Sequence, residues 1–184
     1  MDDREIAARI WTIGHSTHEL EAFTGLLRAH SIELLADVRT VPKSRRMPWF
    51  WGDELAHSLP QAGIAYRHFR DLGGFRRPRP GSPNGGWRVE AFQGYADNME
   101  SESFQAALGQ LIAEARTRRT AVMCAEARWT RCHRRLLSDA LVVRGFEVFH
   151  IGSGGRVERH ALTPFAVVEG DRLVYPPEQT ALDV

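Results

Sequence analysis

The chain has 184 residues, 43% of them hydrophobic and 26% charged, with a net charge of +1, a composition typical of a globular protein that buries its core without disulfides or metals. No apolar run reaches the roughly 20 residues that a transmembrane helix needs, and the charged residues 1–5 are unlike a secretory signal, so a cytoplasmic protein without a membrane partner is expected. Two cysteines, Cys124 and Cys132, exclude a disulfide framework and lack C-x-x-C spacing, so we expect two reduced thiols.

Short apolar runs typical of buried strands alternate with segments of helical periodicity. In chain order, the pattern predicts a strand at 9–14, a helix from 16 to about 30, a strand at 32–38, an irregular segment at 39–51, a helix at 52–62, a strand at 64–69, an irregular loop at 73–88, helices at 91–99 and 104–118, a strand at 120–125, a helix at 131–144 and a strand at 146–151. Ser16, with Glu19 three positions later, is a capping-box pattern for the first helix. Gly170-Asp171 between two β-rich runs predicts a hairpin.

This alternation predicts one α/β domain over 1–184, with a mostly parallel sheet of about five strands flanked by helices. Its core would span about 10–151, and a C-terminal hairpin extension would span about 156–176. Ligands of such sheets bind beyond the carboxyl ends of the strands, so the residues that follow each strand are the candidates for a site.

Polar side chains collect at these strand ends. The candidate catalytic acid and base groups are His15, Asp37, His68, Glu126 and His133. The candidate substrate-binding residues are Ser16, Arg39, Ser44, Arg45, Gly73, Gly74, Arg76 and Arg134. The alternative for Asp37 and Arg39, which lie on the same side of a strand end, is an internal ion pair that shapes the loop.

Several of these residues fall in blocks that resemble the domain of unknown function 488 family, over about residues 10–151. The blocks are Thr12-Ile13-Gly14-His15-Ser16, Asp37-Val38-Arg39 followed by Pro42-x-Ser44, Tyr66-x-His68-x3-Leu72-Gly73-Gly74, Phe92-x2-Tyr95-Ala96-x2-Met99, Cys124-Ala125-Glu126 and Cys132-His133-Arg134. One departure is Arg128-Trp129-Thr130, where the resemblance leads us to expect a proline. The resemblance supports the fold and the site and names no reaction.

Cys132 and His133 allow two interpretations. With Cys124 and His15 they could bind zinc, or they could help to hold a catalytic divalent ion, although adjacent residues on a helix point about 100° apart. Alternatively, Cys132 at a helix start would have a lowered pKa and act as a nucleophile. A packing role is the remaining alternative for each cysteine. The chain has no ATP or NAD signature, so the cofactor stays open.

Two basic stretches favour an anionic partner if they meet in space; the alternative is a bias of composition, because Lys43 is the only lysine and the other basic residues are arginines. Ten Lys and Arg residues lie between Arg39 and Arg88, and seven Arg lie between Arg116 and Arg135. Five aromatic residues accompany the first stretch: Trp49, Phe50, Trp51, Phe75 and Trp87. Residues 81–86 have the composition of a mobile lid.

Our first hypothesis is therefore an enzyme that acts on a phosphate-containing substrate, a nucleotide or nucleic acid. The alternatives are a non-catalytic nucleic-acid-binding or regulatory module, and a metal-binding module that uses Cys132 and His133. The sequence leaves the oligomeric state open.

Overall fold

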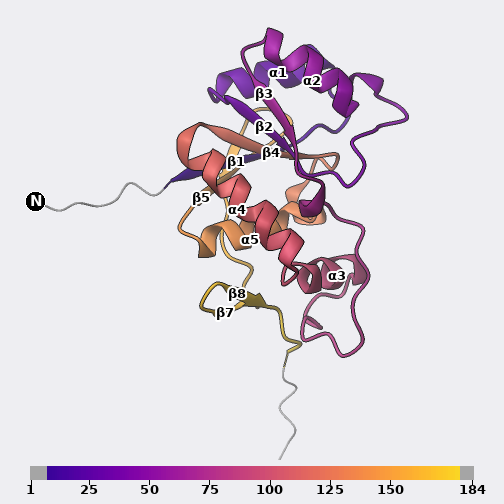
Figure 1. Cartoon of the computed structure of the whole chain (residues 1–184), viewed down its shortest axis with the longest axis vertical. Helices are drawn as coiled ribbons and strands as arrows, with labels where there is room; N and C mark the ends of the chain where they lie inside the picture. Colours follow the sequence, from indigo (N-terminus) through magenta and orange to yellow (C-terminus); the bar gives the residue numbers. More distant parts are fainter. Residues whose placement is uncertain (1–7, 179–184) are drawn as a thin grey trace, which may run out of the picture.

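A computed structural model describes residues 8–178, which form a six-stranded sheet flanked by helices (Figure 1). The strand order is β3-β2-β4-β1-β5-β6, and all neighbours are parallel except β5 and β6. The strands are β1 (Arg9–Gly14), β2 (Leu34–Asp37), β3 (Ala65–His68), β4 (Thr120–Cys124), β5 (Glu147–Ile151) and β6 (Val157–Arg159). The predicted α/β class with a mostly parallel sheet is confirmed. The sixth strand comes from the start of the predicted C-terminal extension, where Val157–Arg159 folds back against β5.

Helices cover both faces of the sheet, and the alternation of side chains along β1 shows how. Trp11 and Ile13 pack toward α1 (Leu20–Ala29) and α2 (Gly52–Gln61). Ile10 packs on the opposite face. That face is covered by α3 (Glu90–Asn98), α4 (Glu102–Thr117) and α5 (Arg134–Val143). Both layers follow from the two-residue period of a strand that is buried on both sides. No helix within residues 8–178 is long and apolar enough to cross a membrane.

The predicted capping box at Ser16 is wrong. The first helix begins at Leu20, and Ser16 has a φ of 47° in a turn before it. The backbone N–H groups of His15 and Ser16 donate to the carbonyls of Cys124 and Ala125, at 2.9 and 3.0 Å. These bonds continue the β1–β4 ladder beyond the strand, and they hold Ser16 away from the position that a helix cap requires.

Gly14 lets these two segments approach each other. A Cβ atom at Gly14 would lie 1.8 Å from the carbonyl oxygen of Glu126, far inside van der Waals contact. Only glycine therefore fits at the end of β1. This contact fixes the course of the segment that follows β4, which carries candidate site residues.

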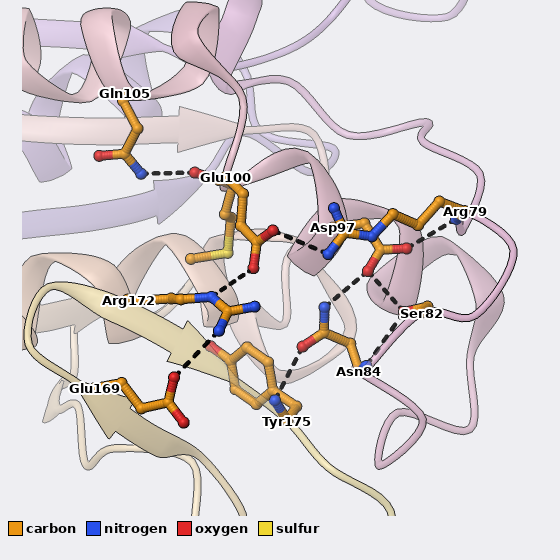
Figure 2. A network of polar contacts seen from close by, with 10 residues as sticks. Arg79, Ser82, Asn84, Asp97, Glu100, Gln105, Glu169, Arg172 and Tyr175 are labelled. Atoms are coloured by element: carbon orange, nitrogen blue, oxygen red, sulfur yellow. Dashed lines mark hydrogen bonds and ion pairs between the residues drawn. The ribbon is translucent and has the colours of Figure 1, made fainter.

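The predicted hairpin is confirmed as β7 (Val167–Glu169) and β8 (Arg172–Val174), with Gly170 in the left-handed region at φ 63°. Figure 2 shows how the chain beyond β8 meets the glycine-rich loop 81–86: the backbone N–H of Tyr175 donates to Asn84 Oδ1, at 2.9 Å. The Asn84 amide in turn donates to Asp97 on α3, at 2.8 Å. These bonds hold the loop on the body of the protein, which argues against the mobile lid expected from its composition.

Replacing Asp97 by alanine is expected to lower the free energy of unfolding by about 2–4 kcal/mol. The Asp97 carboxylate is 9% exposed and accepts from the backbone of Arg79, from Ser82 Oγ and from Asn84 Nδ2, so the variant loses three bonds and leaves donors unpaired. Urea titration of both proteins measures the difference. Glu90→Ala, at the exposed start of the same helix, is the matched control and should stay within about 0.5 kcal/mol. An Asp97→Ala protein as stable as the Glu90→Ala control would contradict the proposed contribution of the Asp97 hydrogen bonds to stability.

Candidate active site

A cavity of about 390 Å³ opens at the carboxyl ends of β2, β3 and β4, and we call it the carboxyl-end pocket. Five of the predicted site residues line it: Arg39, Gly74, Glu126, Cys132 and His133. The other lining residues are Thr40, Val41, Lys43, Phe75, Ala91, Phe92, Cys124, Ala125 and Arg131. The pocket lies where ligands of parallel sheets bind.

Asp37 and Arg39 bond to each other. Arg39 Nη2 lies 2.6 Å from Asp37 Oδ2, and Arg39 Nε lies 2.9 Å from Oδ1. The Tyr66 hydroxyl also donates to this carboxylate, at 2.8 Å. The same guanidinium donates to the carbonyl of Phe50, at 2.7 Å. The Asp37 carboxylate is fully buried, so this is the internal ion pair that the sequence left as the alternative, and it ties β2 to the segment before α2.

His15 lies behind this pair, away from the lining of the pocket. Its Nδ1–H donates to the carbonyl of Ser16, at 3.0 Å, and its Nε2 accepts from Arg39 Nη1, at 3.3 Å. The ring stacks on Phe50, with centroids 4.4 Å apart. Burial, and then the charge of Arg39, lower the pKa of His15 from 6.5 to about 4. The imidazole is therefore neutral near pH 7, and it serves as an acceptor for Arg39.

This neutral histidine makes the fold acid-sensitive. In the unfolded chain His15 takes up a proton near pH 6.5, whereas in the folded protein it does so only near pH 4. The free energy of unfolding therefore contains the full contribution of His15 above pH 6.5 and loses it as the pH falls toward 4. By pH 4 the loss is about 3 kcal/mol. Urea titrations from pH 7 to pH 4 should show this loss, with a smaller slope in His15→Gln. Equal slopes in the two proteins would contradict it.

The remaining predicted residues shape the walls of the site. His68 Nε2–H donates to the carbonyl of Arg39, at 2.7 Å, and Ser44 Oγ accepts from the backbone of Met47. A Cβ atom at Gly73 would lie 2.4 Å from Thr40 Oγ1, and one at Gly74 would lie 3.0 Å from His133 Nδ1. The two glycines thus let the loop after β3 approach both neighbours closely. Arg45 and Arg76 do not line the pocket, although Arg45 is exposed.

Cys132 and His133 lie side by side on the wall of the pocket. Cys132 Sγ lies 3.6 Å from His133 Nδ1, and the opposite ring nitrogen, Nε2, donates to the carbonyl of Val38, at 3.2 Å. The expectation that adjacent side chains diverge is wrong, because Cys132 precedes α5 in an extended conformation, with φ −128° and ψ 151°. A thiol, an imidazole and a carbonyl that fixes the orientation of the imidazole are thus connected in series, an arrangement that could serve a nucleophile and its base.

The surroundings of Cys132 favour its thiolate. The sulfur accepts from the backbone N–H of Arg134, the first residue of α5, at 3.5 Å. Burial alone would raise the pKa of the Cys132 thiol. The hydrogen bonds from Cys124 and His133 outweigh it and hold that pKa well below its usual value, and the charge of Arg134 adds to them. Burial and the nearby Cys132 sulfur instead raise the pKa of Cys124.

Arg134 supports the site from the inside. Its side chain is 1% exposed and donates to the carbonyls of Glu126 and Ala127 and to Thr12 Oγ1. Glu126 itself is exposed, so its carboxylate lies at the mouth of the pocket while its carbonyl is held by Arg134. The guanidinium does not line the carboxyl-end pocket, and it organises the segment between β4 and α5.

The geometry does not assemble the zinc site considered from the sequence. His15 Nε2 faces Arg39, and His133 Nε2 is bonded to Val38. Within residues 8–178 no three His, Cys, Asp or Glu side chains are grouped so that they could hold a metal ion.

The structure also contains a buried polar chain that the sequence analysis missed. Thr12 Oγ1 donates to His150 Nδ1 at 2.6 Å, and His150 Nε2 donates to His160 Nδ1 at 2.9 Å. Asp139 then accepts from His160 at 2.8 Å and from the Tyr175 hydroxyl at 2.9 Å. Within this row of hydrogen-bonded side chains every buried polar atom has a partner, as buried polar groups require. The signal that could have revealed it is a polar residue inside each of two apolar strands, Thr12 and His150.

This row of hydrogen bonds joins β1, β5, α5 and the C-terminal segment. The Trp129 ring covers His150, with centroids 4.0 Å apart, in the segment where a proline was expected. Burial, and then His160, lower the pKa of His150 to about 2, so the ring stays neutral. We assign the chain to the packing of the fold.

Comparison with known proteins places the chain in a family. The model of a family described as "Domain of unknown function DUF488" matches residues 19–141, about two thirds of the chain. This range includes Asp37, Arg39, Cys124, Cys132 and His133. No curated protein and no solved structure matches the chain.

Proposed function

This chain belongs to the DUF488 family, whose description names no activity, and on that premise we propose an enzyme in which the Cys132 thiolate attacks a phosphate-bearing substrate in the carboxyl-end pocket. The observation that carries the proposal is the line Cys132 Sγ, His133 Nδ1 and the Val38 carbonyl, with both side chains on the pocket wall. Thiolate nucleophiles are activated in this way by an oriented imidazole at a helix start.

The proposed step balances with these two side chains. Cys132 gives its proton to His133 Nδ1, and the thiolate forms a bond to the electrophilic phosphorus while the bond to the leaving oxygen breaks. His133 passes the proton to that oxygen. A water molecule then attacks the phosphorus, gives its proton to His133 and releases the Cys132 thiolate.

The mouth of the pocket supports an anionic substrate with an apolar part. Lys43 and Arg131 line it, and neither forms an ion pair within residues 8–178. On the same pocket, Phe75 is 92% exposed and Val41 is 60% exposed. Cations that bind phosphate, next to an exposed ring on which a base stacks, match a nucleotide or the end of a nucleic acid. Arg39 is occupied by Asp37 and is not assigned to the substrate.

Three chromogenic probes test the proposal: p-nitrophenyl phosphate, bis(p-nitrophenyl) phosphate and the p-nitrophenyl ester of thymidine monophosphate. We expect release of nitrophenol, and acid quenching during turnover should trap an adduct on the tryptic peptide that begins at Cys132. The nucleotide ester should have the lowest KM because it alone offers a base to Phe75. Lys43→Ala should raise KM more than kcat falls. Turnover without any adduct at Cys132 would refute the covalent route.

A second candidate is a nucleic-acid-binding module without catalysis. The exposed residues Lys43, Arg45 and Arg46 lie in one loop, and Lys43 Nζ is 5.7 Å from the centre of the Trp51 ring, which is 40% exposed. Such a loop can neutralise phosphates while the indole stacks on a base. This module predicts that a labelled single-stranded DNA loses affinity steeply with salt, that Arg45→Ala/Arg46→Ala weakens it, and that Cys132→Ser leaves it unchanged. Weak binding independent of salt would refute it.

A further inference from the structure

We propose that Cys124 and Cys132 form a reversible disulfide when a hydroperoxide enters the carboxyl-end pocket, which switches the site between a reactive dithiol and an inactive disulfide. The disulfide itself follows from the geometry of the two sulfurs. Only its effect on turnover rests on the proposed function.

The two sulfurs are already in contact. Cys124 Sγ lies 2.7 Å from Cys132 Sγ, and a disulfide requires about 2.05 Å, so a shift of about 0.7 Å closes the bond. Cys124 ends β4, and Cys132 lies two residues before the start of α5. The shift is small enough for rotation of the two cysteine side chains to supply it, so the segment between them, which Gly14 and Arg134 hold in place, does not have to move.

An oxidant can reach the pair from one side. The residues are 2% and 4% exposed, yet both line the carboxyl-end pocket, which holds a small peroxide easily. Two thiols sealed in a core would stay reduced for lack of access. Cys124 and Cys132 lie at the boundary between the core and the pocket, so an oxidant can reach two sulfurs that are already in contact.

The surroundings of the two sulfurs give each a different role in the oxidation. Cys132 accepts one hydrogen bond from the backbone of Arg134 and faces His133, so it supplies the attacking thiolate. Cys124 faces Cys132 and the carbonyl of Glu126, 3.8 Å away, and burial raises its pKa, so it stays a thiol until it is needed. This is the arrangement of an attacking cysteine beside a resolving cysteine.

The reaction balances with hydrogen peroxide as the oxidant. The Cys132 thiolate attacks one peroxide oxygen, the O–O bond breaks, and the departing hydroxide takes the proton held by His133 and leaves as water. The Cys124 sulfur then attacks the sulfenic sulfur of Cys132, and the departing hydroxide takes the proton of Cys124. Two thiols and one peroxide give one disulfide and two waters, with two electrons passing from sulfur to oxygen.

The same surroundings make the disulfide easy to reduce. Arg134 is a buried cation that forms no ion pair with a carboxylate in the described part of the chain, and the Cys132 thiolate is the nearby anion that balances it. Oxidation removes that negative charge and leaves the guanidinium uncompensated. A reduced form stabilised in this way makes a disulfide more oxidising, and a thiol reductant reverses it readily.

Peptide mapping of the full chain tests the disulfide directly. Trypsin cleaves after Arg119, Arg128, Arg131 and Arg134, so Cys124 lies in peptide 120–128 and Cys132 in peptide 132–134. After treatment with equimolar hydrogen peroxide and alkylation, we expect these peptides to appear joined, in protein that runs as a monomer on a non-reducing gel. Dithiothreitol should separate them and restore alkylation of Cys132. In Cys124→Ser the joined peptide is absent, and Cys132 is trapped as a sulfenic acid by dimedone.

Three results would overturn the inference: Cys132 passing to sulfinic acid without a joined peptide, both thiols surviving peroxide in the folded protein, or a joined peptide that occurs only between chains. Failure of the proposed function is separate. If Cys132→Ser keeps its turnover while the wild type forms the disulfide, the covalent mechanism fails and the disulfide stands. If Cys132→Ser is inactive and the wild type forms no joined peptide, the covalent mechanism stands and the disulfide fails.

Discussion

Replacing Cys132 by serine is expected to lower kcat for the nitrophenyl probes by roughly three orders of magnitude. The serine hydroxyl fits the space, but it does not ionise beside His133, so the attacking anion is lost. The measurement is steady-state release of nitrophenol by the variant and the wild type at equal concentration. Cys124→Ser is the matched comparison, because it makes the same sulfur-to-oxygen change in the residue that contacts Cys132 and leaves the nucleophile in place. Its loss should be about tenfold or less.

Unfolding must be excluded as the cause of that loss. Thermal midpoints of the two serine variants should lie close together, because both substitutions are at buried sulfurs with similar exposure. A Cys132 variant that keeps more than about a tenth of the wild-type kcat would end the covalent mechanism. The pocket would then have to act through general acid–base chemistry at His133 and Glu126.

Replacing Asp37 by alanine is expected to lower the free energy of unfolding by about 3–5 kcal/mol. Asp37 is fully buried, and the variant would leave the Arg39 guanidinium, itself 6% exposed, without its counter-charge. The Tyr66 hydroxyl would lose its acceptor as well. Urea unfolding, followed by the fluorescence of the tryptophans, measures the change. The midpoint should fall without a change in slope if the native fold is retained.

The control for this prediction is Glu114→Ala. Glu114 pairs with Arg67 and Arg118 at distances of 2.9 and 2.8 Å, but these partners are 41% and 34% exposed. Solvent screening limits such pairs to about 1 kcal/mol or less. Equal losses in Asp37→Ala and Glu114→Ala would show that burial does not set the cost of breaking the Asp37–Arg39 pair.

The sequence by itself determined the class of fold, and it indicated the edge of the sheet at which the structure has a pocket. Apolar runs at 9–14, 120–125 and 146–151 alternate with helical periodicity, and this pattern is local, so it can be read without neighbours. The rule that ligands lie beyond the carboxyl ends of parallel strands then pointed to the segments after β2, β3 and β4, which do meet at one cavity. Cys132 was among the candidates because a thiol at a helix start has known chemistry.

Only the tertiary structure decided which of the polar residues face the pocket and which face each other. Asp37 and Arg39 turn toward one another because a buried charge is more stable with a counter-charge than alone. Arg134 points into the core, where it donates to the carbonyls of Glu126 and Ala127. The approach of Cys124 to Cys132, and the chain from Thr12 through His150 to Asp139, depend on the strand order and on where the loops return. Those are contacts between residues distant in sequence, and no local pattern encodes them.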